Sequence, residues 1–152
     1  MQDDINDLYQ ELILDHNAHP HNYGELKGAT HHALGQNPLC GDEIAVFLKI
    51  KDGQVEDVHF MGHGCAISKS SASMMTDALK GKSLDEAKAL FEQFHTLLTS
   101  SSENKTHTLE NLGKIAVFSG VKQFPARVKC ATLAWHTVKA AIDGAAEPIT
   151  TE

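Results

Sequence analysis

Apolar residues recur at helical and strand periods along the chain and predict a short series of elements. The first is a helix over residues 4–17, where Ile5, Leu8, Leu12 and Ile13 make one apolar stripe. Residues 18–42 are rich in His, Asn, Gly and Pro, which predicts mostly loop with at most one short strand.

A β-hairpin is predicted next. Apolar and other residues alternate over 44–51, Asp52-Gly53 is typical of a tight turn, and residues 55–60 form the return strand. The two far ends of an antiparallel hairpin meet at one edge. The segment just before the first strand, residues 40–42, is therefore expected beside Cys65, which follows the second strand.

The rest of the chain predicts helices. One follows Cys65 and stops at Gly81, and the capping box Ser83-x-x-Glu86 begins another over residues 84–98. A short helix is predicted over 109–118 and a last one over 127–142. Several helices beside a small antiparallel β-sheet define an α+β fold. We expect one domain over residues 1–144 and a flexible C-terminal tail over 145–152.

Composition and charge narrow the classes of function. The chain has 13 Lys and Arg against 20 Asp and Glu, a formal net charge of −7, which argues against a nucleic-acid partner. No stretch approaches the ~20 apolar residues that span a bilayer. The acidic N-terminus lacks the basic and apolar regions of a signal peptide. We therefore expect a cytoplasmic protein that binds neither nucleic acid nor membrane.

The three cysteines are the strongest candidates for chemistry. Cys40 opens Cys-Gly-Asp, Cys65 closes Gly-His-Gly-Cys, and Cys130 lies near the start of the last predicted helix. An odd number of widely spaced cysteines in a cytosolic protein indicates metal or redox chemistry. Helix N-termini favour the thiolate, which is both nucleophile and metal ligand. Asp42 shares a face with Cys40 in an extended chain, so three thiolates and one carboxylate can fill a tetrahedral zinc site.

Each of these residues also has a structural interpretation. A lone cysteine is usually core filler, the favoured interpretation of Cys130 by itself, and Asp42 alone would be a turn residue. His63 is interpreted as a solvated loop histidine rather than a ligand. For the three cysteines together, ligation or sulfur chemistry is favoured over core packing.

Several motifs run from the first predicted helix to the last and are specific when taken in order. They are Leu8-Tyr9-x-x-x-Ile13-Leu14-Asp15-His16, Asn37-Pro38-Leu39-Cys40-Gly41-Asp42, Phe60-x-Gly62-x-Gly64-Cys65-Ala66-Ile67-Ser68, Ser71-Ala72-Ser73-Met74-Met75 and Phe124-Pro125-x-Arg127-x-Lys129-Cys130-Ala131-Thr132-Leu133-x-Trp135. With these motifs the chain resembles the IscU/SufU (NifU N-terminal-like) family of iron–sulfur cluster assembly proteins, and the SufU branch in particular.

The resemblance implies a SufE/NifU-like α+β fold and metal ligands at Cys40, Asp42, Cys65 and Cys130. In the IscU branch a histidine usually precedes the third cysteine. Here that position is Lys129, which weighs against a histidine-ligated cluster. SufU-type proteins are zinc-bound sulfur acceptors for a pyridoxal-phosphate cysteine desulfurase.

Three hypotheses follow. The favoured one is a Zn²⁺-dependent sulfur acceptor that takes persulfide sulfur through Cys40 from a cysteine desulfurase and serves downstream iron–sulfur assembly or recipient proteins. Arg127 is a weaker candidate for anchoring, with a surface ion pair as its structural interpretation. The second hypothesis is a scaffold that binds iron and builds and transfers a [2Fe–2S] cluster. The third is a structural zinc module that docks proteins.

Overall fold

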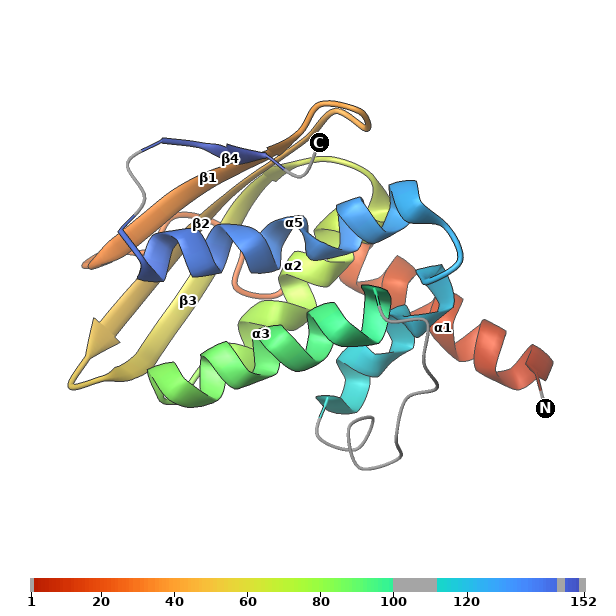
Figure 1. Ribbon diagram of the computed structural model, residues 1–152, viewed down its shortest axis with the longest axis horizontal. Coiled ribbons are helices and arrows are strands. Elements are labelled where there is room, and N and C mark those ends of the chain that lie inside the picture. Colours follow the sequence, from red (N-terminus) through yellow and green to blue (C-terminus); the bar gives the residue numbers. More distant parts are fainter. Residues whose placement is uncertain (1, 100–111, 145–146, 151–152) are drawn as a thin grey trace.

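The computed structural model describes residues 2–99, 112–144 and 147–150 of the 152-residue chain, with side chains from residue 10 onward (Figure 1). In chain order the elements are α1 (Gln2–Ala18), β1 (His31–Asn37), β2 (Asp42–Lys51), β3 (Gln54–His63), α2 (Ala66–Leu79), α3 (Leu84–Thr99), the 3-10 helix η1 (Gly113–Val121), α5 (Pro125–Ile142) and β4 (Ile149–Thr150).

The sheet has four strands in the order β3-β2-β1-β4. The predicted hairpin is present, because β2 pairs antiparallel with β3, and β1 adds antiparallel to the other side of β2. Asn37 at the end of β1 pairs with Asp42 at the start of β2, and His63 at the end of β3 pairs with the next residue of β2. The short turn that carries Cys40 therefore lies at the same end of the sheet as the end of β3. The α+β class is thus confirmed.

The sheet differs from the prediction at its outer edge. Ile149 and Thr150 pair parallel with Gly35 and Gln36, which makes the sheet mixed rather than wholly antiparallel. These residues fall in the segment predicted as a flexible tail, whose residues 145, 146, 151 and 152 lie outside the described part. Ile149 packs against the hydrophobic core, which gives this short strand a reason to pair.

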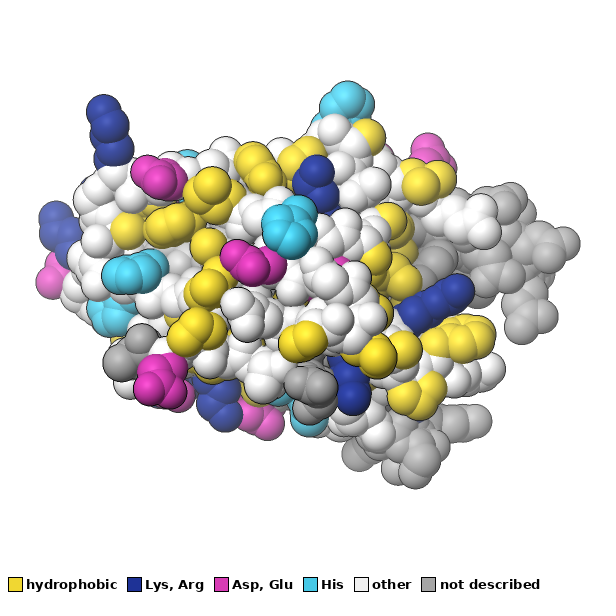
Figure 2. Space-filling model, turned by 90° about the horizontal axis from the view of Figure 1, so that it is seen from above, with side chains coloured by type: hydrophobic (Ala, Val, Ile, Leu, Met, Phe, Trp, Pro, Cys, Tyr) yellow, Lys and Arg dark blue, Asp and Glu magenta, His cyan; other side chains and the backbone are white. Residues whose placement is uncertain are grey.

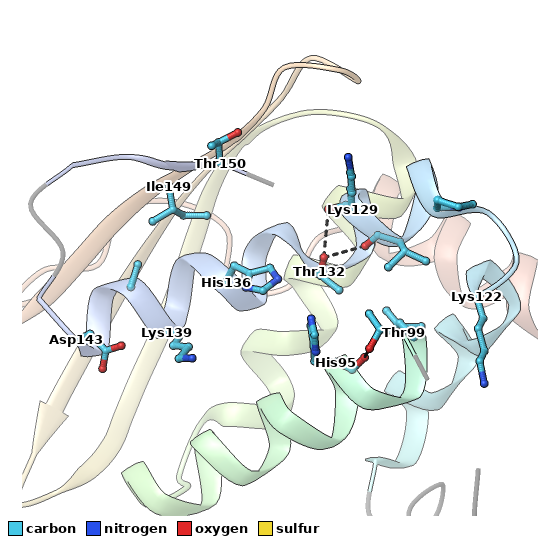
Figure 3. A pocket seen from close by; sticks show the side chains of 14 residues that line it. His95, Thr99, Lys122, Lys129, Thr132, His136, Lys139, Asp143, Ile149 and Thr150 are labelled. Carbon is cyan, nitrogen blue, oxygen red and sulfur yellow. Dashed lines mark hydrogen bonds between the residues drawn. The ribbon is translucent and has the colours of Figure 1, made fainter. Parts of the chain in front are cut away.

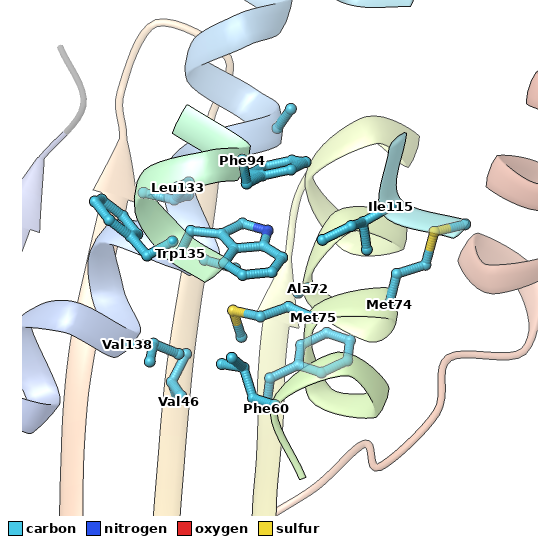
Figure 4. Close-up of a cluster of buried hydrophobic side chains, with 14 of the residues drawn as sticks. Val46, Phe60, Ala72, Met74, Met75, Phe94, Ile115, Leu133, Trp135 and Val138 are labelled. Carbon is cyan, nitrogen blue, oxygen red and sulfur yellow. The ribbon is translucent and has the colours of Figure 1, made fainter. Parts of the chain in front are cut away.

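The helices cover one face of the sheet and enclose the core between the two layers (Figure 1). Ile44, Val46 and Leu48 of β2 are fully buried, while the residues between them are only partly covered. Above the strands, Trp135 of α5 stacks on Phe94 of α3 with ring centroids 4.6 Å apart (Figure 4). Alternation in the strands therefore marks the buried face, as the sequence pattern requires.

Several helix boundaries follow from local chemistry. The capping box is confirmed: the Ser83 backbone N–H donates to Glu86 Oε1 at 3.0 Å, and the Glu86 N–H donates to Ser83 Oγ at 3.1 Å. The last helix begins at Pro125, two residues earlier than predicted, because proline fits the first helical turn. Of the short helix predicted over 109–118, residues 109–111 lie outside the described part, and the remainder overlaps the 3-10 helix η1.

The face seen from above mixes small groups of hydrophobic side chains with side chains of both charges and with histidines (Figure 2). In the described part of the chain, no helix is both long and apolar enough to cross a membrane.

Candidate metal-binding site

Three of the four predicted ligands converge at one end of the sheet, where β1 ends and β2 begins. Cys40 lies in the β1–β2 turn, Asp42 is the first residue of β2, and Cys130 projects from α5. One possible ligand atom from each lies within 4.8 Å of those of the other two. The sulfurs of Cys40 and Cys130 are 3.3 Å apart. Two sulfurs bound tetrahedrally to one zinc ion at about 2.3 Å would be about 3.8 Å apart, so a small adjustment fits both to one ion.

Cys65 lies beside this trio and contacts it through Asp42. Its sulfur is 4.0 Å from Asp42 Oδ2, and its backbone N–H donates to Asp42 Oδ1 at 2.8 Å. Cys65 is also the N-cap of α2, where its sulfur accepts the Ser68 N–H at 3.4 Å. Its predicted place at a helix N-terminus and beside the start of β2 is therefore confirmed.

Cys130 is placed differently from the prediction. Since α5 begins at Pro125, Cys130 lies in the second turn, beyond the unpaired N–H groups of the helix start. It is 2% exposed. The prediction that a helix N-terminus favours the Cys130 thiolate is thus wrong. Cys130 reaches the site because α5 packs against β1 and β2.

The three thiols differ in exposure. Cys40 is exposed, Cys65 is half-buried and Cys130 is buried, while Asp42 is 2% exposed. A buried carboxylate is costly unless it is paired with donors or a cation. Asp42 and Cys130 thus form the buried part of the site, and the thiol of Cys40 is the one most accessible to a partner.

The thiols also differ in acidity. Hydrogen bonding to Cys130 and to the Ser68 N–H lowers the pKa of Cys65 to about 7, against the opposing effect of burial. The same bond with Cys65, together with burial, raises the pKa of Cys130. Of these two thiols, Cys65 is therefore the more acidic.

Asn37 is a site residue that the sequence analysis missed. It is fully buried, and its amide Nδ2 lies 3.4 Å from Asp42 Oδ2 and 3.5 Å from Cys130 Sγ. Its Oδ1 has no hydrogen-bond partner among the described residues. The only available signal was its place at the head of the Asn-Pro-Leu-Cys-Gly-Asp motif.

Glycine is required beside the site. A Cβ atom on Gly64 would lie 2.5 Å from Asp42 Oδ1 and 3.0 Å from its Cγ. That is too close for an unchanged structure, so glycine lets the chain before Cys65 pass directly over the carboxylate.

The other predicted residues lie around the site. His63 is exposed at the end of β3, in keeping with a solvated histidine. Lys129 is partly buried on α5, and the guanidinium of exposed Arg127 lies 4.7 Å from the centroid of the Phe124 ring. The anchoring role of Arg127 stays a prediction.

A cavity of 710 Å³ lies elsewhere, between α3, α5 and β4 (Figure 3). His95, His136, Lys129 and Lys139 are among its lining residues, and none of the four predicted ligands is. The cysteine cluster and this cavity are therefore separate features of the molecule.

Fold and site together define a class: a small α+β domain with a cluster of cysteine thiols and one carboxylate at the edge of its sheet. The model of the NifU-like N terminal domain family matches residues 8–131. The chain belongs to this family, which contains the IscU and SufU iron–sulfur cluster assembly proteins. The resemblance drawn from the motifs is thus confirmed.

Relatives of both kinds cover most of the chain. It is 43% identical over 138 residues to the iron–sulfur cluster assembly scaffold protein IscU of Streptococcus pyogenes serotype M1, covering 91% of this chain and 84% of the relative. It is 38% identical over 135 residues to the zinc-dependent sulfurtransferase SufU of Bacillus subtilis, covering 89% of each. The crystal structure of the N-terminal part of a nitrogen-fixing NifU-like protein from Brucella abortus superposes with a TM-score of 0.78 at 25% identity, covering 91% of this chain and 94% of that one.

Proposed function

We propose that this protein is a zinc-binding sulfur acceptor in iron–sulfur cluster assembly, which takes persulfide sulfur from a pyridoxal-phosphate cysteine desulfurase through Cys40. The observation that carries the proposal is the division of the site. One thiol is exposed, while its neighbours Asp42 and Cys130 are buried within ligand distance of one another. The similarity to the Bacillus subtilis sulfurtransferase supports the same function.

Cys40, Asp42, Cys65 and Cys130 are the residues that would hold the zinc ion. The donors suit it, because zinc binds thiolate sulfur and carboxylate oxygen and needs no redox change. When bound, the ion would keep the thiols deprotonated. Hydrogen bonding already lowers the pKa of Cys65 to about 7, and Asn37 directs its amide group toward both Asp42 and Cys130.

Sulfur transfer needs one displacement at sulfur. The Cys40 thiolate attacks the terminal sulfur of the desulfurase persulfide, so that a bond forms from Cys40 to that sulfur. The sulfur–sulfur bond of the donor breaks, and the donor cysteine leaves with the electron pair and takes up a proton. Cys40 ends as a persulfide without a net oxidant or reductant, ready to pass its sulfur to downstream assembly or recipient proteins.

Replacement of the thiol tests this role. Cys40→Ala should abolish persulfide on the protein and stimulation of alanine release by the desulfurase of the same organism. Persulfide is measured by alkylation and mass spectrometry. His63→Gln, a change at an exposed neighbour, serves as the control and should behave as wild type. Undiminished stimulation by Cys40→Ala would remove the proposed role.

The second candidate is a scaffold that builds and passes on a [2Fe–2S] cluster, favoured by the similarity to the streptococcal IscU. Lys129, where a histidine ligand would be expected, weighs against it. Metal analysis and visible absorption of anaerobically purified protein separate the two. Colourless protein with about one zinc per chain supports the acceptor, and brown protein that transfers its cluster supports the scaffold.

A further inference from the structure

A second group of metal-ligating side chains lies near the other end of α2. His16 comes from α1, His21 from the loop that follows it, and Asp77 from the last turn of α2. One ring nitrogen of each histidine and one carboxylate oxygen lie within 4.8 Å of one another. Asp77 lies about 18 Å along the helix from Cys65, at 1.5 Å per residue. The group is therefore separate from the thiol site.

Hydrogen bonds orient this group without any ion. Ser73 Oγ lies 2.7 Å from His16 Nδ1 and accepts the His21 backbone N–H at 2.8 Å. Asn22 Nδ2 donates to Asp77 Oδ1 at 3.2 Å, while Asp77 Oδ2 faces His21 Nδ1 at 2.5 Å. Ser73 and Asn22 are neighbours of the kind that typically fix histidine and carboxylate ligands in metal sites. The direct contact between His21 and Asp77 is one that a bound ion would replace.

Burial gives the group an inner wall and an open side. His16 is 5% exposed, whereas the side chains of His21 and Asp77 are 46% and 48% exposed. An ion can thus reach His21 and Asp77 from solvent, while burial holds the ring of His16 in place. Two imidazoles and one carboxylate suit divalent ions of the later first row, and three protein ligands leave positions for water.

We propose that His16, His21 and Asp77 form a second site, which binds a divalent transition-metal ion such as Zn²⁺, Co²⁺ or Ni²⁺. The competing account is a purely hydrogen-bonded clasp that holds α1 and the following loop against α2.

Cobalt distinguishes the two sites by colour. Protein loaded with one equivalent of Zn²⁺ and free of any affinity tag is titrated with Co²⁺ by calorimetry and visible absorption. We expect one further ion per chain with weak d–d bands and no sulfur-to-cobalt charge-transfer band, because the second site offers nitrogen and oxygen only. No further ion, or uptake with the charge-transfer band alone, would overturn the proposal.

Two exposed positions supply the variants. His21→Gln and Asp77→Asn should each weaken the second binding event by at least tenfold and leave thermal unfolding of the metal-free protein cooperative. His19→Gln, a change at an exposed histidine two residues away, should bind as wild type. Equal cobalt affinity in His21→Gln and wild type would contradict the site. Failure of sulfur transfer by Cys40 would leave this test unaffected, because metal binding by His16, His21 and Asp77 does not depend on sulfur transfer.

Discussion

Asn37 is not one of the proposed ligands, yet its side chain contacts two of them. Its buried amide bridges the carboxylate of Asp42 and the sulfur of Cys130, which come from different layers of the fold. A neutral donor in that position holds both groups in place whether or not an ion is bound. Such supporting contacts affect metal affinity without binding the metal.

Asn37→Ala is therefore expected to weaken zinc binding at the thiol site by about 10–100-fold. The amide that positions Asp42 and Cys130 would be lost, while all four proposed ligands remain. Competition with a chromophoric chelator measures the change. Gln36→Ala, on the same strand and only partly buried, is the control. Equal zinc affinity in Asn37→Ala and the control would mean that the amide has no positioning role.

Residue patterns account for only part of the site. The hairpin ends predict that Cys65 lies beside residues 40–42, because strand pairing alone brings them together. Nothing in periodicity places Cys130 there, since its approach depends on how α5 packs across β1 and β2. The number and spacing of the cysteines favoured joint ligation, and the resemblance to the family implied it. Asn37 was missed because asparagine before proline is typical of a loop.

At the scale of elements, β1 is the one short strand that the prediction for residues 18–42 allowed but did not place. Its buried positions are Ala33, Gly35 and Asn37, which are small or polar and give almost no apolar alternation. Small residues are needed there because α5 crosses close to the strand. A Cβ on Gly35 would overlap Thr137 Oγ1 and lie 3.1 Å from Leu133 Cδ1. The two-residue strand β4 is likewise too short to carry a period.

This close approach gives a test of packing. Gly35→Ala should lower the free energy of unfolding by about 1–3 kcal/mol, because the added methyl forces α5 away from β1. Thr137→Ala removes the overlapping hydroxyl, whose own bond is to the Leu133 carbonyl. In the double variant the cost of Gly35→Ala should therefore shrink, as measured by urea unfolding. If the losses in unfolding free energy from the two single changes simply add in the double variant, the Thr137 hydroxyl is not the source of the cost.

For the whole molecule, stability should depend on pH through a partly buried histidine. Burial lowers the pKa of His136, and the nearby His95 and Lys139 lower it further. The folded state thus binds its proton less readily than the unfolded chain, whose histidines titrate near 6.5. The stabilisation is fully present above that pH and is lost as pH falls below it.

His136→Gln should consequently show a smaller fall in melting temperature than wild type when pH is lowered from 7.5 to 5.5. Both proteins are compared in the same metal state, so that any titration of the thiol site cancels. His32→Gln, at an exposed position of β1, should follow wild type. An unchanged pH response in His136→Gln would assign the acid sensitivity to other groups.

The thiol site is assembled from segments far apart in the chain, and this has a consequence for the newly made protein. Cys130 follows Cys40 by 90 positions and is carried by the last helix. While the ribosome is still making that helix, Cys40, Asp42 and Cys65 have already been synthesised. The helix that carries Cys130 has not yet packed against the sheet. If the four residues hold a metal ion as proposed, stable loading therefore has to wait until the final helix has been translated and has packed against the sheet.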